Sequence, residues 1–322
     1  MSRLAARAAL RAGRSYALLP GTKHASPAIH EPILPRPLPD PVPAFQVLEA
    51  EGTPVPIVLS SPHSGRHYPP ELLTRLAVPA AALRCLEDGP LDRLVAPCRE
   101  QGVPAILATH ARAYVDLNRE PAEIDPGSFE GVAAAGGSLK LTSKVRAGLG
   151  VVPTRLGELA IYRRKLPPGE LEDRLTRVYH PYHTRLGRML DEQHRRFGVV
   201  LLLDCHSMPA EAASLRGGGR PVDVVLGDRF GRACDARIVQ AAQRWLENAG
   251  LLALRNQPYA GGYITERHGD PARGRHALQI ELRRGLFMDE ATGTPTGGLA
   301  RIGAVLCGLV QELAGHVARL GR

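Results

Sequence analysis

The stretch LLLDCHSMP, residues 201–209, passes from three leucines straight into ionisable and nucleophilic side chains. An apolar run of this kind is typical of a strand buried in a sheet that is covered on both faces. Asp204, His206 and Ser207 would then lie at the carboxyl end of that strand. Because ligands bind at this end of open α/β sheets, the stretch predicts a central strand and part of a binding site.

Three further apolar runs end in polar groups in the same way. They are IVLSS (57–61) before His63, AYVDL (113–117) before Asn118 and Arg119, and ALQI (277–280) before Glu281. Helical patterns alternate with these runs, most clearly over 169–198 and 297–320. The alternation predicts an α/β domain with a largely parallel sheet, at whose edge the polar groups converge.

The beginning of the chain differs from the rest. Eight prolines from residue 20 to residue 43 exclude a helix or a central strand there. We therefore expect residues 1–44 to be extended or disordered and residues 45–322 to form a single domain. The first thirty residues hold five basic side chains and no acid, which is typical of a transit peptide or of a disordered extension. We favour the extension.

Composition excludes several classes of function. The net charge is +9, with 41 basic and 32 acidic residues, and removing the five basic residues of the first thirty leaves 36 against 32, or +4. This surplus, with no basic stripe, predicts no nucleic-acid partner. No run approaches the roughly 20 apolar residues of a membrane helix, so no membrane association is expected.

The cysteines indicate the compartment. Five cysteines without a CxxC pair argue against a disulfide framework and for a reducing, cytoplasmic location. We expect a small-molecule substrate and either a monomer or a homodimer.

The polar groups at the strand ends suggest a hydrolytic metal site. His63 and His206 could bind Zn²⁺ through neutral imidazoles, with a carboxylate as third ligand and water in the fourth position. Such a metal lowers the pKa of water toward ~7. Glu281 could act as general base, and Asn118 and Arg119 could bind a substrate carboxylate.

Other interpretations stay open at this point. Each histidine could be a hydrogen-bonded structural residue, since neither belongs to an HExxH motif. Asp204 could orient a neighbour or cap a turn. A Cys205–His206 pair is disfavoured because adjacent residues on a strand point to opposite faces. The Gly-rich segment 256–276 could be a surface loop or could cover the substrate.

The motifs taken together resemble one family. They are SPHSGRHYP (61–69), VDLNR (115–119), DCHSMP (204–209), NQPYAGGYIT (256–265) and HALQIELRRGLFMDE (276–290). In this order they are similar to the N-formylglutamate amidohydrolase family, over about residues 55 to 290. The resemblance implies a three-layer α/β/α, phosphorylase/hydrolase-like fold, shared with zinc carboxypeptidases and aspartoacylases. It also implies metal-assisted hydrolysis of an N-formyl or N-acyl amide.

The resemblance carries over to individual residues. It implies one Zn²⁺ per chain on His63 and His206, catalysis by Glu281 and Arg119, and substrate-carboxylate binding by Asn118 and Arg119. The zinc-peptidase pattern expects an acid three residues after the first histidine, where this chain has an arginine.

The resemblance leaves two assignments open: the third metal ligand and the arginine that would bind a second substrate carboxylate. The third metal ligand is therefore expected in the acidic segment 86–89, with Asp88 preferred over Glu87. Arg66, Arg112 and Arg284 are candidates for a second substrate carboxylate. The alternative to an enzyme is a non-catalytic relative that binds a small ligand and has lost the metal.

Overall fold

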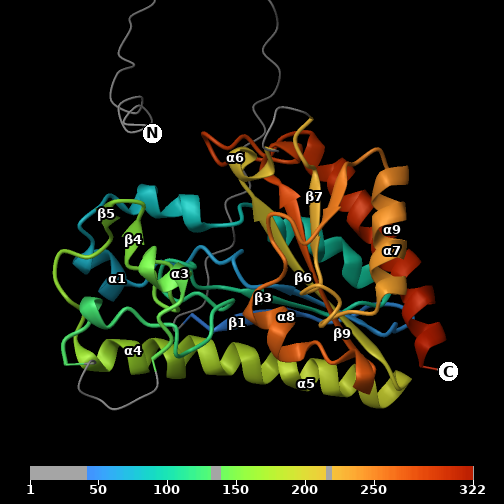
Figure 1. Ribbon diagram of the computed structural model, residues 1–322, viewed down its shortest axis with the longest axis horizontal. Coiled ribbons are helices and arrows are strands. Elements are labelled where there is room, and N and C mark those ends of the chain that lie inside the picture. The colour runs from blue at the N-terminus through green and yellow to red at the C-terminus, as the bar shows by residue number, and fades with distance from the viewer. Residues whose placement is uncertain (1–41, 132–138, 215–219, 322) are drawn as a thin grey trace, which may run out of the picture. The chain divides into compact units, whose positions relative to one another are not determined.

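The strand that carries the opening motif, β6 (Val200–Met208), is buried along its whole length. The computed structural model describes residues 42–131, 139–214 and 220–321 (Figure 1). The expectations for the first 44 residues thus lie almost entirely outside the described residues. Within the described ranges, β6 lies in the middle of a seven-stranded sheet.

The sheet is mixed, with a parallel centre. Its strands, in spatial order, are β1 (Phe45–Leu48), β3 (Ala105–Ala108), β2 (Ile57–Ser61), β6, β9 (Arg275–Arg283), β7 (Val224–Gly227) and β8 (Ala253–Arg255). The pairs β3–β2, β2–β6, β6–β9 and β7–β8 are parallel, whereas β1–β3 and β9–β7 are antiparallel. A two-stranded hairpin, β4 (Arg155–Leu156) and β5 (Leu159–Ala160), lies outside this sheet.

Helices follow the strands in the predicted alternation. The α-helices are α1 (Pro70–Arg75), α2 (Leu91–Val95), α3 (Ser143–Arg146), α4 (Pro168–Arg174), α5 (His180–Phe197), α6 (Ala210–Ala213), α7 (Ala236–Asn248), α8 (Tyr263–His268) and α9 (Gly298–Leu320). A π-helical segment, η6 (Leu175–Tyr179), joins α4 to α5. The 3-10 segments are η2 (Ala80–Leu86), η3 (Ala96–Gln101), η4 (Pro126–Ser128), η7 (Pro271–Arg273) and η8 (Arg284–Leu286).

Helices cover both faces of the sheet. On one face, Leu201 and Leu203 of β6 pack in a core shared with α2, α7 and α9. On the other face, Leu202 packs in a second core to which α5 contributes Leu186 and Met189. Figure 1 shows α5 running beneath the sheet while α7 and α9 stand on the opposite side. This is the three-layer α/β/α arrangement that was expected.

Two expectations need correction. The apolar run and its polar end, residues 113–119, were predicted to form a strand, but they form turns and irregular backbone. The reason is that buried side chains take up the backbone carbonyl groups: Arg174 donates to the carbonyl of Tyr114 and His183 contacts that of Leu117.

In addition, α9 is long and apolar enough to span a membrane, contrary to the sequence expectation. Its apolar face, with Ile302 in it, packs in the core.

Candidate metal centre and active site

The central strands place two pairs of side chains on one face of the sheet. Asp204 and His206 are two residues apart on β6, and Gln279 and Glu281 are two residues apart on β9, so each pair points in one direction. The parallel register sets His206 level with Glu281. All four residues are buried. The sheet therefore assembles half of the site from two strands alone.

The residue between the members of the first pair faces the other way. Cys205 packs in the opposite core with Leu203 and Ile280. Burial raises the pKa of its thiol, so this sulfur is neutral and enclosed. The alternation that argued against a Cys–His nucleophile pair in the sequence is thus present in the structure.

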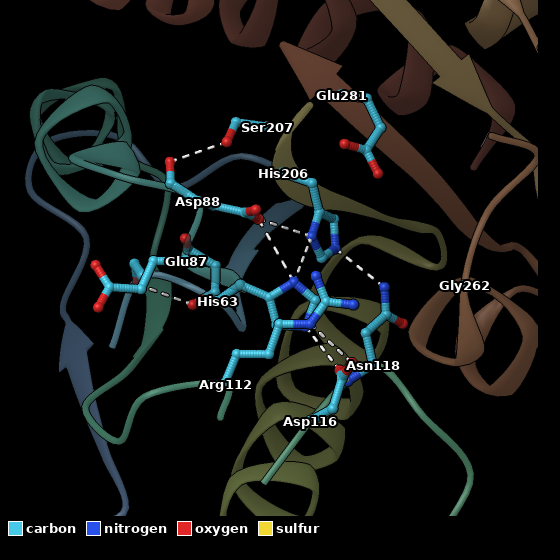
Figure 2. Close-up of polar contacts among 12 residues, drawn as sticks. His63, Glu87, Asp88, Arg112, Asp116, Asn118, His206, Ser207, Gly262 and Glu281 are labelled. Atoms are coloured by element: carbon cyan, nitrogen blue, oxygen red, sulfur yellow. Dashed lines mark hydrogen bonds and ion pairs between the residues drawn. The ribbon is translucent and has the colours of Figure 1, made fainter. Parts of the chain in front are cut away.

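Three potential ligands converge next to these strands. His63 follows β2, Asp88 follows η2, and both meet His206 (Figure 2). His206 Nδ1 lies 3.1 Å from His63 Nδ1 and 3.0 Å from Asp88 Oδ2, and His63 Nδ1 lies 3.5 Å from that same oxygen. The three donor atoms lie within 4.8 Å of one another in a buried position. We call His63, Asp88 and His206 the ligand cluster.

A carboxylate holds the remote nitrogen of each imidazole. His63 Nε2 is 2.7 Å from Asp116 Oδ1, and His206 Nε2 is 2.9 Å from Asp204 Oδ2. A proton on each Nε2 donated to these acids leaves both Nδ1 lone pairs directed at the cluster. This is the usual arrangement of metal-binding histidines. Two imidazole nitrogens and one carboxylate oxygen also form a donor set suited to catalytic zinc, so the residues fit this ion.

The charges around the cluster favour a cation. Although burial opposes it, contacts with the two histidines hold the pKa of Asp88 far below its usual value. Burial likewise opposes charge on His206, but Asp204 and Asp88 raise the pKa of that imidazole well above its usual value. Asp116 is also ionised, mainly because Arg112 offsets its burial and lowers its pKa. Three buried carboxylates beside two imidazoles would stabilise a divalent cation.

Glu281 has the environment of a general base. Its carboxylate is buried, and Gln279 Nε2 donates to its Oε1 at 2.7 Å. Burial raises the pKa of Glu281 to about 7; the negative charge of Asp88 adds to this, whereas His206 opposes it. A carboxyl group with a pKa near neutrality can both accept and return a proton.

The predicted arginines divide into two groups. Arg119 is half-enclosed: its Nε donates to the carbonyl of Leu149 and its Nη1 to that of Asn118, while no described residue accepts from Nη2. Arg112 lies beside the His63 imidazole and donates from Nε to Asp116 at 2.8 Å. Arg119 Nε also lies 3.9 Å from Asp116 Oδ2, so both guanidinium groups are next to the carboxylate that holds His63.

The other two arginines bind protein groups. Arg66 forms an ion pair with Asp92 at 2.5 Å and donates to the carbonyl of Gly89, so its described polar contacts leave out the ligand cluster. Arg284 donates to Ser207 Oγ at 3.1 Å and lies 3.6 Å from Asp88 Oδ1. The structure brings Arg284, but not Arg66, into contact with the cluster.

The two candidates for the third metal ligand, Asp88 and Glu87, point in different directions. Asp88 enters the cluster, whereas Glu87 turns away and accepts a hydrogen bond from Tyr68. Asn118 is buried; its Nδ2 donates to Gln279 Oε1 at 3.4 Å, and its Oδ1 accepts from the backbone of Ile264. Both polar atoms of Asn118 thus contact protein, and its binding of a substrate carboxylate stays a prediction.

Asp116 and Gln279 are part of the site but were not identified from the sequence. Both lie in quoted motifs, VDLNR and HALQIELRRGLFMDE, and each stands two residues before a residue that was singled out. For Gln279 the strand period of two was an available signal, because it places this side chain on the face of Glu281. For Asp116 the same period was no valid signal, since it lies in irregular backbone between two turns.

Comparison with known proteins identifies the family of the chain. A family model described as N-formylglutamate amidohydrolase matches residues 55–288. The chain belongs to the N-formylglutamate amidohydrolase family. The match begins just before β2 and ends after β9, so it includes every residue of the ligand cluster and Glu281. The resemblance seen in the five sequence motifs is thereby confirmed.

Individual relatives agree with this family. N-formylglutamate deformylase of Pseudomonas putida is 30% identical over 240 residues, covering 73% of this chain and 83% of the relative. The enzyme of the same name from Pseudomonas aeruginosa is 29% identical over 280 residues, covering 86% and 98%. The crystal structure of N-formylglutamate amidohydrolase from Ralstonia eutropha matches with a TM-score of 0.80 and 36% identity, covering 85% and 98%. This last similarity confirms the predicted fold class.

Proposed function

We propose that this family member hydrolyses the amide bond of N-formyl-L-glutamate or a related N-acyl amino acid, with a metal ion as cofactor. The products are formate, or another acid, and the free amino acid. The names of the two Pseudomonas relatives support the substrate class. The observation that carries the proposal is the convergence of three buried ligand atoms next to Glu281.

The ligand cluster would hold one zinc ion through His63 Nδ1, His206 Nδ1 and Asp88 Oδ2. Zinc supplies Lewis acidity, which makes water a nucleophile near neutral pH and polarises a carbonyl group. Asp116 and Asp204 hold the two imidazoles in the tautomer that leaves Nδ1 free to bind.

Glu281 would move the proton during hydrolysis. Its carboxylate accepts a proton from the attacking water and passes it to the amide nitrogen, which leaves as an amine. Oε1 is held by Gln279, while no described residue donates to Oε2, so Oε2 is the oxygen available for this transfer. The carboxylate must be close to the metal for both steps, and the register of β6 and β9 supports that closeness.

Arg119 and Arg112 are the best-placed groups for an acidic substrate. No described residue accepts a hydrogen bond from Arg119 Nη2, and Arg112 lies next to His63. A guanidinium binds a carboxylate through a bidentate fork. Arg119 would bind one carboxylate of the substrate and Arg112 the second, whereas Arg66 is already paired with Asp92.

A substrate panel tests the proposal. Protein stripped with a chelator and reloaded with zinc is assayed on N-formyl-L-glutamate, N-acetyl-L-glutamate and N-formyl-L-alanine. We expect fastest release of formate from N-formyl-L-glutamate, loss of activity in the stripped protein, and recovery on reloading. If the zinc-loaded protein binds these compounds without cleaving any of them, the protein is a ligand-binding relative and the proposed activity is wrong.

A further inference from the structure

Gln279 occupies the position between the proposed base and a neighbouring loop. Its Nε2 donates to Glu281 Oε1 at 2.7 Å, and its Oε1 accepts from the backbone N–H of Gly262 at 2.7 Å. Asn118 Nδ2 lies 3.4 Å from the same Oε1. The side chain is buried, so water does not compete for these contacts.

Gly262 is where α8 begins. The first N–H groups of a helix have no acceptor within the helix, and no side chain of α8 or its cap supplies one here. Two amide oxygens from elsewhere do so: Gln279 accepts from Gly262 N, and Asn118 accepts from Ile264 N at 2.8 Å. The start of α8 is therefore fixed to β9 and to the turn that carries Asn118.

The amide of Gln279 fits this position in one orientation. Rotation by 180° would set its oxygen against the carboxylate of Glu281 and its NH₂ against the N–H of Gly262, leaving like groups facing each other on both sides. A carboxylate or an apolar side chain would satisfy at most one of the two neighbours. The orientation of Glu281 and the position of the loop before α8 thus depend on the same amide.

We propose that Gln279 is a positioning residue that fixes the Glu281 carboxylate for proton transfer and couples it to the loop at Gly262. This inference rests on the proposed function for its kinetic consequence only. One oxygen of Glu281 is held by the amide and the other is left for the reacting water. Movement of the loop would reach Glu281 through a single side chain, so the segment that borders the site and the base would be ordered together.

Three variants separate the two contacts. Gln279→Met keeps the size of the side chain and removes both hydrogen bonds. Gln279→Glu keeps an acceptor for Gly262 and removes the donor to Glu281. Trp245→Phe is the control, because it removes one tertiary hydrogen bond, from Trp245 Nε1 to the carbonyl of Val305, between α7 and α9.

Each zinc-loaded variant is compared with the unmodified protein by kcat, KM, metal content and amide hydrogen exchange over residues 256–268. We expect kcat to fall by about 10²-fold in both Gln279 variants, with KM changed less than about 3-fold and zinc content unchanged, since general-base catalysis contributes on the order of 10²–10⁴. Exchange over 256–268 should accelerate in Gln279→Met and stay near normal in Gln279→Glu. Trp245→Phe should alter neither kcat nor this exchange.

The outcomes are distinguishable from a failure of the proposed function. If the unmodified protein cleaves no substrate, the activity is wrong, and the exchange data still decide whether Gln279 holds the loop. Unchanged exchange in Gln279→Met overturns the coupling. A normal kcat in Gln279→Glu overturns the positioning of Glu281, and a parallel loss of kcat and zinc in both variants would assign Gln279 to the integrity of the metal site.

Discussion

His206 and Glu281 occupy the same level of two adjacent parallel strands, β6 and β9. Neighbouring strands lie about 4.8 Å apart, so this register brings a proposed metal ligand and a proposed base together through the backbone alone. Both side chains then point to the face that carries Asp204 and Gln279, their positioning partners. A shift of one residue in either strand would turn one of the two away from the site.

Replacing the base separates metal binding from catalysis. In Glu281→Gln the carboxylate becomes an amide of the same size, so it can no longer take up a proton, and the three ligand atoms are untouched. We expect unchanged zinc content and a fall in kcat of about 10³-fold, within the range for general acid–base groups. Steady-state kinetics with metal analysis on one preparation checks this. Turnover at the normal rate would remove Glu281 from the mechanism.

Asp116 should act through His63. The variant Asp116→Asn can still accept a hydrogen bond, but it lacks the charge that fixes the imidazole and balances the metal. Loss of such a partner lowers metal affinity by about 10–100-fold. Zinc competition titrations measure this effect. Asp92→Asn is the control, because it breaks an ion pair with Arg66 outside the ligand cluster; an equal loss of affinity in the control would show that the effect is not specific.

Recognition of the negatively charged substrate should depend on Arg119 and not on Arg66. Arg119→Ala removes the guanidinium proposed to bind a substrate carboxylate, so KM for N-formyl-L-glutamate should rise by on the order of 10-fold or more, as expected for a charge-assisted hydrogen bond. KM for N-formyl-L-glutamine amide, which lacks both carboxylates, should change little, and Arg66→Ala should leave both values near normal. Initial-rate measurements with the two substrates check this. Equal weakening for the acid and the amide contradicts a carboxylate-binding role.

Gly262 is predicted to be intolerant of any side chain. A Cβ there would lie 2.4 Å from Asn118 Nδ2, and Asn118 is held between Gln279 and α8. We expect Gly262→Ala to lower the free energy of unfolding by about 1–3 kcal/mol, as overpacking does. Gly187→Ala on α5 meets no atom within 4 Å and should be neutral or stabilising. Denaturant titrations compare them; equal stability of both variants would show that the site accommodates the methyl group.

The sequence predicted the strands that carry the chemistry better than the segments between them. β2, β6 and β9 are buried on both faces, so each is a continuous apolar run whose end can be read directly. Residues 113–119 have the same appearance but form turns and irregular backbone, because Arg174 of α4 and His183 of α5 contact their backbone carbonyl groups. Sequence periodicity carries no information about such long-range contacts.

The same distinction applies to the site. His63 and His206 follow or end central strands, so their convergence could be predicted from topology. The choice between Asp88 and Glu87 could not be derived from topology, since these neighbours differ only in the direction that the chain takes after η2. Arg66 was one candidate for a second substrate carboxylate, but its pairing with Asp92 depends on tertiary structure.

The metal content of matched variants tests the central claim most directly. Zinc bound per chain is measured by inductively coupled plasma mass spectrometry after dialysis, for the unmodified protein, His206→Ala, Asp88→Ala and Glu87→Ala, each checked for folding by circular dichroism. The account predicts one zinc per chain in the unmodified protein and in Glu87→Ala, and far less in the other two. Folded His206→Ala or Asp88→Ala that still holds one zinc per chain would contradict it.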